Sequence, residues 1–136
     1  MKKTKNKENV MKKFCVMLVL CLLLPACGQP GADIVQNIDY RLENAPENAE
    51  ITLRFENGKY FGQGPVNHYF GTYILDAKNN MIYFSGVAST RMAGPENLMK
   101  AEQEYFAALS AANRIYTTKN KLILLAPGNR KLVYEK

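Results

Sequence analysis

The sequence predicts an α+β domain. We expect a compact, curved antiparallel β-sheet of about eight short strands, partly closed like a barrel, with one α-helix near residues 95–110. Two observations predict this fold. Short runs of alternating apolar and polar residues recur at close spacing after residue 37, with turn residues between them. The apolar period changes to that of a helix over one stretch, and strand-like runs then resume.

The strand-like runs can be bounded by their turns. The predicted strands are residues 38–43, 50–55, 59–62, 68–75, 81–88, 114–118, 121–126 and 131–135. The second run alternates regularly, which directs Ile51, Leu53 and Phe55 to one face. Asn57-Gly58 separates it from the third run, and both residues tolerate positive φ. This pair therefore predicts a two-residue hairpin.

A helix near residues 95–110 is predicted from the residues at its start and from the spacing of residues along one of its faces. Pro95 suits the first helical position, and Glu96 suits the positive end of the helix dipole. The residues that fall on one face at helical spacing are Met99, Glu102, Phe106 and Leu109.

Glu102 is the unusual member of this stripe because it is a carboxylate among apolar residues. A buried carboxylate needs a partner, and we expect Arg91 to supply it. The alternative role for Glu102 is general acid or base, which requires a cleft and a second titrating group. The structural role is the favoured interpretation.

The N-terminus has the pattern of an export signal. Six lysines precede an apolar run from Phe14 to Leu24, which is shorter than the roughly 20 residues of a spanning helix. The run ends in Leu24-Pro25-Ala26-Cys27, which resembles the lipobox of bacterial lipoprotein precursors. The resemblance implies a signal peptide over 1–26, with translation starting at Met1 or Met11. It also implies lipidation of Cys27, a tether over 27–37 and a domain over 38–136.

Composition excludes several classes of function once the signal is removed. The chain has a net charge of +6, but residues 1–26 hold six lysines and one glutamate, which leaves a net charge of +1. The electrostatic case for nucleic-acid binding therefore disappears. Cys15 and Cys21 lie in the signal, and His68 is the only histidine, so no zinc site of the usual kind can be assembled. We expect no metal and no cofactor.

Three segments together resemble the META domain, or HslJ-like, family. The first, over 62–73, resembles the family pattern G-x-x-x-C-N-x-Y-x-G-x-Y, and the second, over 90–94, resembles T-x-M-A-C, in each case at every fixed position except the cysteine. The third is the predicted helix. The residues that carry the resemblance are Asn67, Tyr69, Gly71, Tyr73, Thr90, Arg91, Met92, Glu102, Phe106 and Leu109. We interpret these residues as mainly structural, with Asn67 hydrogen-bonded to backbone groups.

The chain departs from the family pattern at its two cysteines. Val66 stands where the first motif often has cysteine, and Gly94 stands where the second motif often has it. Both are replaced together, as expected if the two positions act as a pair. A disulfide or redox role proposed for the family therefore does not carry over to this chain.

The resemblance implies a non-catalytic envelope lipoprotein with a role in stress tolerance. Its expected partners are the membrane, through the lipid on Cys27, and an envelope protein. Gly28 after the cysteine favours the outer membrane in a two-membraned source. One alternative is a binding module for a small apolar ligand or peptide, in a pocket between sheet and helix. The other is a hydrolase, whose candidate carboxylates are Glu56, Asp76, Glu102 and Glu104.

Overall fold

The computed structural model describes residues 35–136. The predicted signal peptide, Cys27 and most of the predicted tether lie outside the described residues. Within the described part, no helix is long and apolar enough to cross a membrane. The elements are β1 (Asp39–Leu42), β2 (Thr52–Glu56), β3 (Lys59–Gln63), β4 (His68–Asp76), β5 (Met81–Phe84), β6 (Ala88–Ser89), α2 (Glu96–Ala111), β7 (Arg114–Thr117), β8 (Lys121–Ala126) and β9 (Arg130–Glu135).

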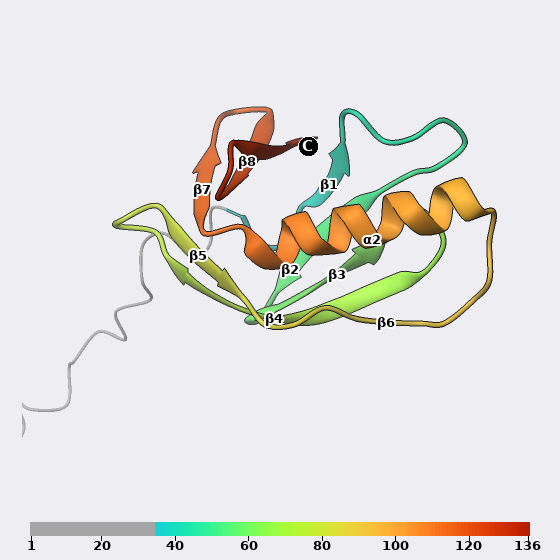
Figure 1. Ribbon diagram of the computed structural model, residues 1–136. Coiled ribbons are helices and arrows are strands. Elements are labelled where there is room, and N and C mark those ends of the chain that lie inside the picture. Colours follow the sequence, from blue (N-terminus) through green and yellow to red (C-terminus); the bar gives the residue numbers. More distant parts are fainter. Residues whose placement is uncertain (1–34) are drawn as a thin grey trace, which may run out of the picture.

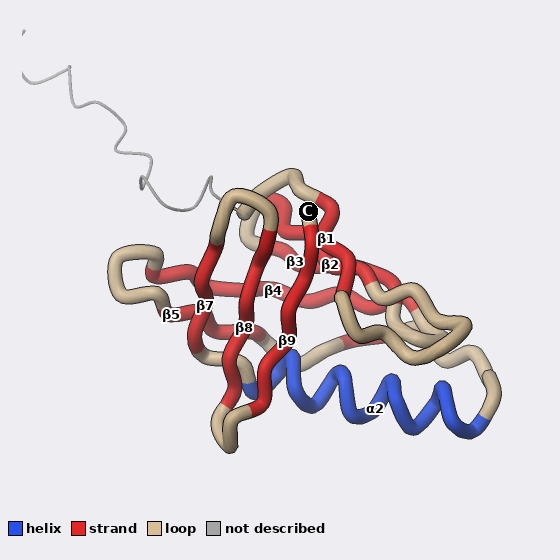
Figure 2. The backbone as a smooth tube through the Cα atoms, turned by 90° about the horizontal axis from the view of Figure 1, so that it is seen from above, coloured by secondary structure: helices blue, strands red, loops and turns tan. Residues whose placement is uncertain are grey.

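The strands form a closed antiparallel barrel. Its order is β3-β2-β1-β9-β8-β7-β5-β4, and β4 pairs back onto β3. The two-residue strand β6 adds to β4 outside this ring. Figure 1 shows β7 and β8 above helix α2 and β4 and β6 below it, and Figure 2 shows β7, β8 and β9 crossing over β4. The predicted curved sheet with one helix is confirmed for residues 35–136, and the closure is more complete than predicted.

The predicted strand over 81–88 is divided into β5 and β6. The backbone N–H of Ser85 still donates to the Thr72 carbonyl at 2.8 Å. The return bond, however, runs from the Thr72 N–H to the Ser85 side-chain Oγ, also at 2.8 Å. A hydroxyl therefore takes the place of a backbone carbonyl at this point, and the ladder resumes only at Ala88.

The strength of pairing varies around the barrel. Strands β8 and β9 pair over six positions, and β3 and β4 pair over five. Strands β1 and β9 share only two pairs, and β5 and β7 share the single pair Met81↔Arg114. Helix α2 packs against β5, β8 and β9, so it bridges the sparsely paired strand β5 and the extensively paired strands β8 and β9.

The turns confirm the hairpin prediction. Asn57 and Gly58 have φ of 50° and 77° and connect the pair Glu56↔Lys59, which is the geometry that the Asn-Gly signal predicts. The helix is confirmed with a shift of one residue. Pro95 has extended backbone and precedes the helix as its N-cap residue, whereas the sequence placed it at the first helical position.

The domain also begins earlier than predicted. Val35 is only 2 % exposed and belongs to the core, and the Asn37 N–H donates to the Phe55 carbonyl at 2.9 Å. Residues 35–37 therefore belong to the domain, although the sequence assigned them to the tether. A short segment that starts with Gly and Pro shows no period from which this packing could be predicted.

Candidate functional site

The buried carboxylate of Glu102 receives three hydrogen bonds from the loop before β4. Its Oε2 accepts the backbone N–H groups of Val66 at 2.8 Å and Asn67 at 2.7 Å, and its Oε1 accepts the Asn67 side-chain amide at 2.7 Å. Glu102 is 5 % exposed. Hydrogen bonds from amide donors to an ionised carboxylate are short and strong, so they stabilise the buried charge.

Asn67 joins this carboxylate to a third segment of the chain. Its side-chain Oδ1 accepts the Met92 N–H at 2.7 Å and the Thr90 hydroxyl at 2.9 Å. Its Nδ2 donates to Glu102 and also to the Met92 carbonyl at 3.4 Å. A primary amide is suited to this position because it donates and accepts at once. The β3–β4 loop, the segment before α2 and the helix itself are thereby fixed to one another.

The predicted Arg91–Glu102 pair is wrong. Arg91 is exposed, and within residues 35–136 its side chain takes part in no ion pair. The segment runs extended past Asn67, so the residues on either side of Arg91 contact that amide while Arg91 faces solvent. Glu102 needs no cation because three N–H groups already satisfy it.

The two positions that lack the family cysteines are neighbours in space. A Cβ atom added to Gly94 would lie 3.5 Å from the Val66 Cβ and less than 3 Å from both Val66 methyl groups. The valine side chain therefore occupies the space beside Gly94. This adjacency agrees with the interpretation of the two positions as a pair.

Gly71 has a packing role. A Cβ atom at this position would lie 2.4 Å from the Tyr60 hydroxyl and 2.6 Å or less from its ring. Tyr60 lies directly across the β3–β4 ladder from Gly71, and its hydroxyl donates to the Ser85 carbonyl at 3.0 Å. Glycine at position 71 thus lets the Tyr60 ring approach the β4 backbone closely.

A chain of tyrosine hydroxyls crosses the core. Tyr69 donates to the Thr52 carbonyl at 2.6 Å, and its oxygen lies 2.7 Å from that of Tyr105, which lies 3.0 Å from that of Tyr134. Tyr69 has one proton to give, so Tyr105 must donate to Tyr69, and Tyr134 must donate to Tyr105. Burial is the main cause that raises the pKa of all three phenols, so they stay protonated at neutral pH.

The remaining motif residues pack in the core around this chain. Tyr73 meets Phe55 edge to face with ring centroids 4.8 Å apart, and Leu109 is fully buried. Phe106 packs on Tyr69 at 5.3 Å but stays partly exposed. The buried aromatic residue of the helix is Tyr105, which the sequence analysis missed. The sequence could have indicated its burial, because Tyr105 lies three residues after Glu102 and so falls on the same side of the helix.

The other candidate carboxylates lie on separate elements. Asp76 begins the β4–β5 turn, where the Asn79 amide donates to it at 2.7 Å and lowers its pKa. Glu56 lies at the end of β2 beside Arg54, and Glu104 is exposed on α2. None of them lies beside Glu102 in a hydrogen bond or ion pair among the described residues. Across residues 35–136, no group of His, Cys, Asp and Glu side chains could hold a metal ion.

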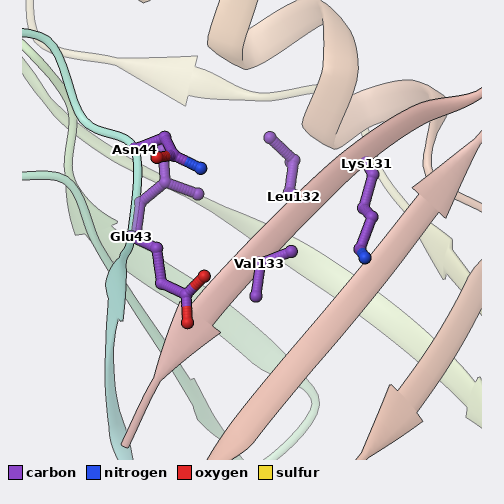
Figure 3. Close-up of a pocket in the computed structure, with 6 residues that line it drawn as sticks. Glu43, Asn44, Lys131, Leu132 and Val133 are labelled. Carbon is purple, nitrogen blue, oxygen red and sulfur yellow. The ribbon is translucent and has the colours of Figure 1, made fainter.

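A cleft of about 380 Å³ lies between the end of β1 and the start of β9. Figure 3 shows its lining. The lining residues are Leu42, Glu43, Asn44, Lys131, Leu132 and Val133. The Glu43 carboxylate, which forms an ion pair with Lys121, and Lys131 make its rim polar. It differs from the predicted pocket, which was to be aromatic and placed between sheet and helix.

Comparison with known proteins identifies the family and the fold. Residues 35–136 match the META domain. A protein from Burkholderia xenovorans, solved by NMR, is similar with a TM-score of 0.64 and 20 % identity, over 76 % of this chain and 84 % of that one. A second NMR structure is similar with a TM-score of 0.60 and 20 % identity, over 76 % and 92 % of the two chains. No curated protein matches the chain. With its Asn67–Glu102 network inside the matched region, the chain belongs to the META domain family.

Proposed function

We propose that this protein is a membrane-anchored lipoprotein of the bacterial envelope, and that its META domain acts without catalysis as an interaction module in stress tolerance. Acyl chains on Cys27 hold the domain at the membrane, and Gly28 directs it to the outer membrane in a two-membraned cell. Each buried CH₂ group contributes about 0.8 kcal/mol, so two or more chains give lasting attachment.

The single observation that carries this proposal is the internal use of the polar motif residues. Both carboxylate oxygens of Glu102 accept hydrogen bonds from the loop, and the Asn67 amide is engaged through both its oxygen and its nitrogen. Groups occupied in this way hold one arrangement of loop, strand and helix. Their occupation favours the interpretation of a rigid, preformed domain that presents a surface to a partner. It disfavours a catalytic site, which would have to exchange protons with a substrate.

The anchor is tested by Cys27→Ala in the full chain expressed in a bacterial host. We expect the wild-type protein in the detergent-soluble membrane fraction and the Cys27→Ala protein in a different state, either released or retained as uncleaved precursor. Mass spectrometry of the mature N-terminus should find a diacylglyceryl modification in the wild type. Cys21→Ala is the matched control, because this cysteine lies within the segment that is removed. An unmodified wild-type N-terminus would contradict the anchor.

The interaction role is tested by cross-linking the wild-type protein in intact envelopes and identifying what is captured. One dominant envelope protein, captured more strongly under heat or antibiotic stress, is the expected result. A turnover of envelope polymers that purified protein catalyses and that Glu102→Gln abolishes would contradict a non-catalytic role.

The cleft beside β1 and β9 favours a second candidate function, the binding of a short peptide. Its lining combines the apolar residues Leu132 and Val133 with the charged groups of Glu43 and Lys131 at the rim. Clefts that combine apolar side chains with placed polar groups are typical ligand sites. Native mass spectrometry of protein purified from envelopes should then detect a retained peptide, and Val133→Arg should abolish the retention.

A further inference from the structure

One outer surface of the barrel carries large apolar side chains. We define the outer apolar face by Phe61 on β3, Phe70 and Ile74 on β4, and Tyr83 on β5. Ile74 is 71 % exposed, Phe70 57 % and Tyr83 49 %. Exposed apolar side chains that are gathered on one face mark interaction sites on proteins more often than singly scattered apolar residues do.

The register places these four residues on one face in two rows. Phe61 lies directly opposite Phe70, and Ile74 lies directly opposite Tyr83. Side chains that are directly opposite in an antiparallel pair point to the same side of the sheet. The row between them pairs Lys59 with Thr72, so a cationic side chain lies among the apolar ones. The stem of a lysine can cover apolar surface while its ammonium group stays at a polar level.

The described chain begins next to one end of this face. The Gln36 side-chain oxygen accepts the Asn57 N–H at 3.1 Å. The next residue, Gly58, accepts the Tyr73 N–H at 3.0 Å. Ile74 follows directly on the outer side of β4. Two hydrogen bonds therefore connect the point where the N-terminal segment enters the domain to the row of Ile74 and Tyr83.

The length of the N-terminal segment limits where an anchored domain can be. Val35 is eight residues after Cys27, and eight residues span at most about 29 Å when fully extended. A domain of 100 residues has a radius of gyration of about 13 Å. A domain tethered at Cys27 therefore stays within about one domain width of the bilayer.

We propose that the outer apolar face rests on the lipid bilayer surface. The inference depends on the proposed anchor at Cys27 and adds the orientation of the domain. Ile74, Phe70 and Phe61 enter the boundary between headgroups and acyl chains, while Tyr83 lies at the level that tyrosine prefers in membrane interfaces. Lys59 lies at the level of the lipid phosphates. The tether keeps the outer apolar face at a high effective concentration near the bilayer, so weak contacts are enough to hold the face on the lipid.

The chain contains no tryptophan, which allows clean single-site reporters. Tyr83→Trp places one indole on the outer apolar face. Tyr116→Trp is the matched control, because Tyr116 is similarly exposed (42 %) but lies on β7, outside the β3–β5 strands that carry the outer apolar face. Both variants are made in the full chain, purified with the native lipid anchor, and reconstituted into phosphatidylcholine vesicles with plain or brominated acyl chains. Near-ultraviolet circular dichroism checks that each variant is folded.

We expect brominated lipid to quench the indole of Tyr83→Trp and to leave that of Tyr116→Trp nearly unchanged. Adding Ile74→Glu to Tyr83→Trp should abolish the quenching while the protein stays attached to the vesicles. Equal quenching of the two reporters, or none at position 83, in protein that floats with the vesicles would overturn the proposed orientation and leave the anchor intact. Protein that does not float with the vesicles would contradict the anchor and, with it, the membrane-facing surface.

Discussion

Strand β4 has two faces whose environments differ completely. On the inner face, Tyr69 and Tyr73 are buried. The Tyr69 hydroxyl donates to the Thr52 carbonyl and is also hydrogen-bonded to the hydroxyl of Tyr105. On the outer face, Phe70 and Ile74 are exposed, although both are as apolar as the residues of the core. The alternation of the strand places these opposite environments one residue apart.

The difference shows what the family motif records. Its tyrosines, its Asn67 and its Gly71 all point inward or shape the inner packing. The exposed apolar residues of β4, Phe70 and Ile74, alternate with these tyrosines on the outside and are not among the motif residues. The motif therefore identifies the fold, while the surface that is available to a partner lies on the alternate residues of the same strand.

The largest predicted effect tests the inner network. Glu102→Ala leaves the N–H groups of Val66 and Asn67 and the Asn67 side-chain amide without their acceptor. Each unsatisfied buried donor costs about 1–3 kcal/mol, so unfolding in urea should show a loss of about 3 kcal/mol or more. Glu104→Ala on the exposed side of the same helix is the control and should cost far less. Equal effects for the two variants would contradict the role of the network.

A second prediction uses the contact beside that network. Val66→Cys combined with Gly94→Cys should form a disulfide, because the two Cβ atoms would be 3.5 Å apart, within the range of disulfide geometry. A disulfide that closes a loop of this length raises the unfolding free energy by about 3–4 kcal/mol, because it lowers the entropy of the unfolded chain. Any strain in the folded state reduces this gain. Thermal unfolding with and without a reductant measures the difference. Two free thiols under oxidising conditions would show that positions 66 and 94 do not approach as described.

A third prediction compares two buried phenols. Tyr69→Phe removes a hydroxyl that donates to the Thr52 carbonyl and meets Tyr105, and should cost about 1–2 kcal/mol of unfolding free energy. Tyr40 is also fully buried, but among residues 35–136 its hydroxyl is the one buried side-chain polar atom that lacks a hydrogen-bond partner. Burial raises its pKa to about 12. Tyr40→Phe should therefore leave stability unchanged or increase it, and a loss as large as that of Tyr69→Phe would refute the contrast.

The smallest predicted effect concerns the outer face. Ile74→Ser should change the unfolding free energy by about 0.5 kcal/mol or less, because substitutions at exposed sites away from special features are near neutral. Tyr73→Ser, one residue earlier, removes an aromatic ring from the core and is the matched comparison. A large loss for Ile74→Ser in denaturant unfolding would show that the outer face contributes to the fold after all.

The elements themselves were predictable from local sequence. Alternation located the strands, Asn57-Gly58 located a hairpin with both residues at positive φ, and helical spacing located α2 to within one residue. These features depend on residues that are close in sequence. The division of the fifth strand was not predictable, because it depends on the Ser85 hydroxyl replacing a carbonyl across the ladder.

The partners within the site were less predictable. Periodicity indicated that Glu102 is buried, but charge alone suggested Arg91, whereas the actual donors are amides about 35 residues away. A backbone N–H leaves no signal in a sequence, since every residue except proline carries one. Likewise, the chain from Tyr69 through Tyr105 to Tyr134 depends on three elements meeting in space.

The burial of Val35 has a mechanical consequence for a domain held by its N-terminus. A pull on Cys27 would be applied to the protein where the chain enters the core. The first bonds under load would be those of Asn37 to the Phe55 carbonyl and of Gln36 to the Asn57 N–H. These lie outside the barrel ladder that joins β1 to β2. Residues 35–37 would therefore detach from the domain and extend first, while the strands after them would keep their register under moderate force.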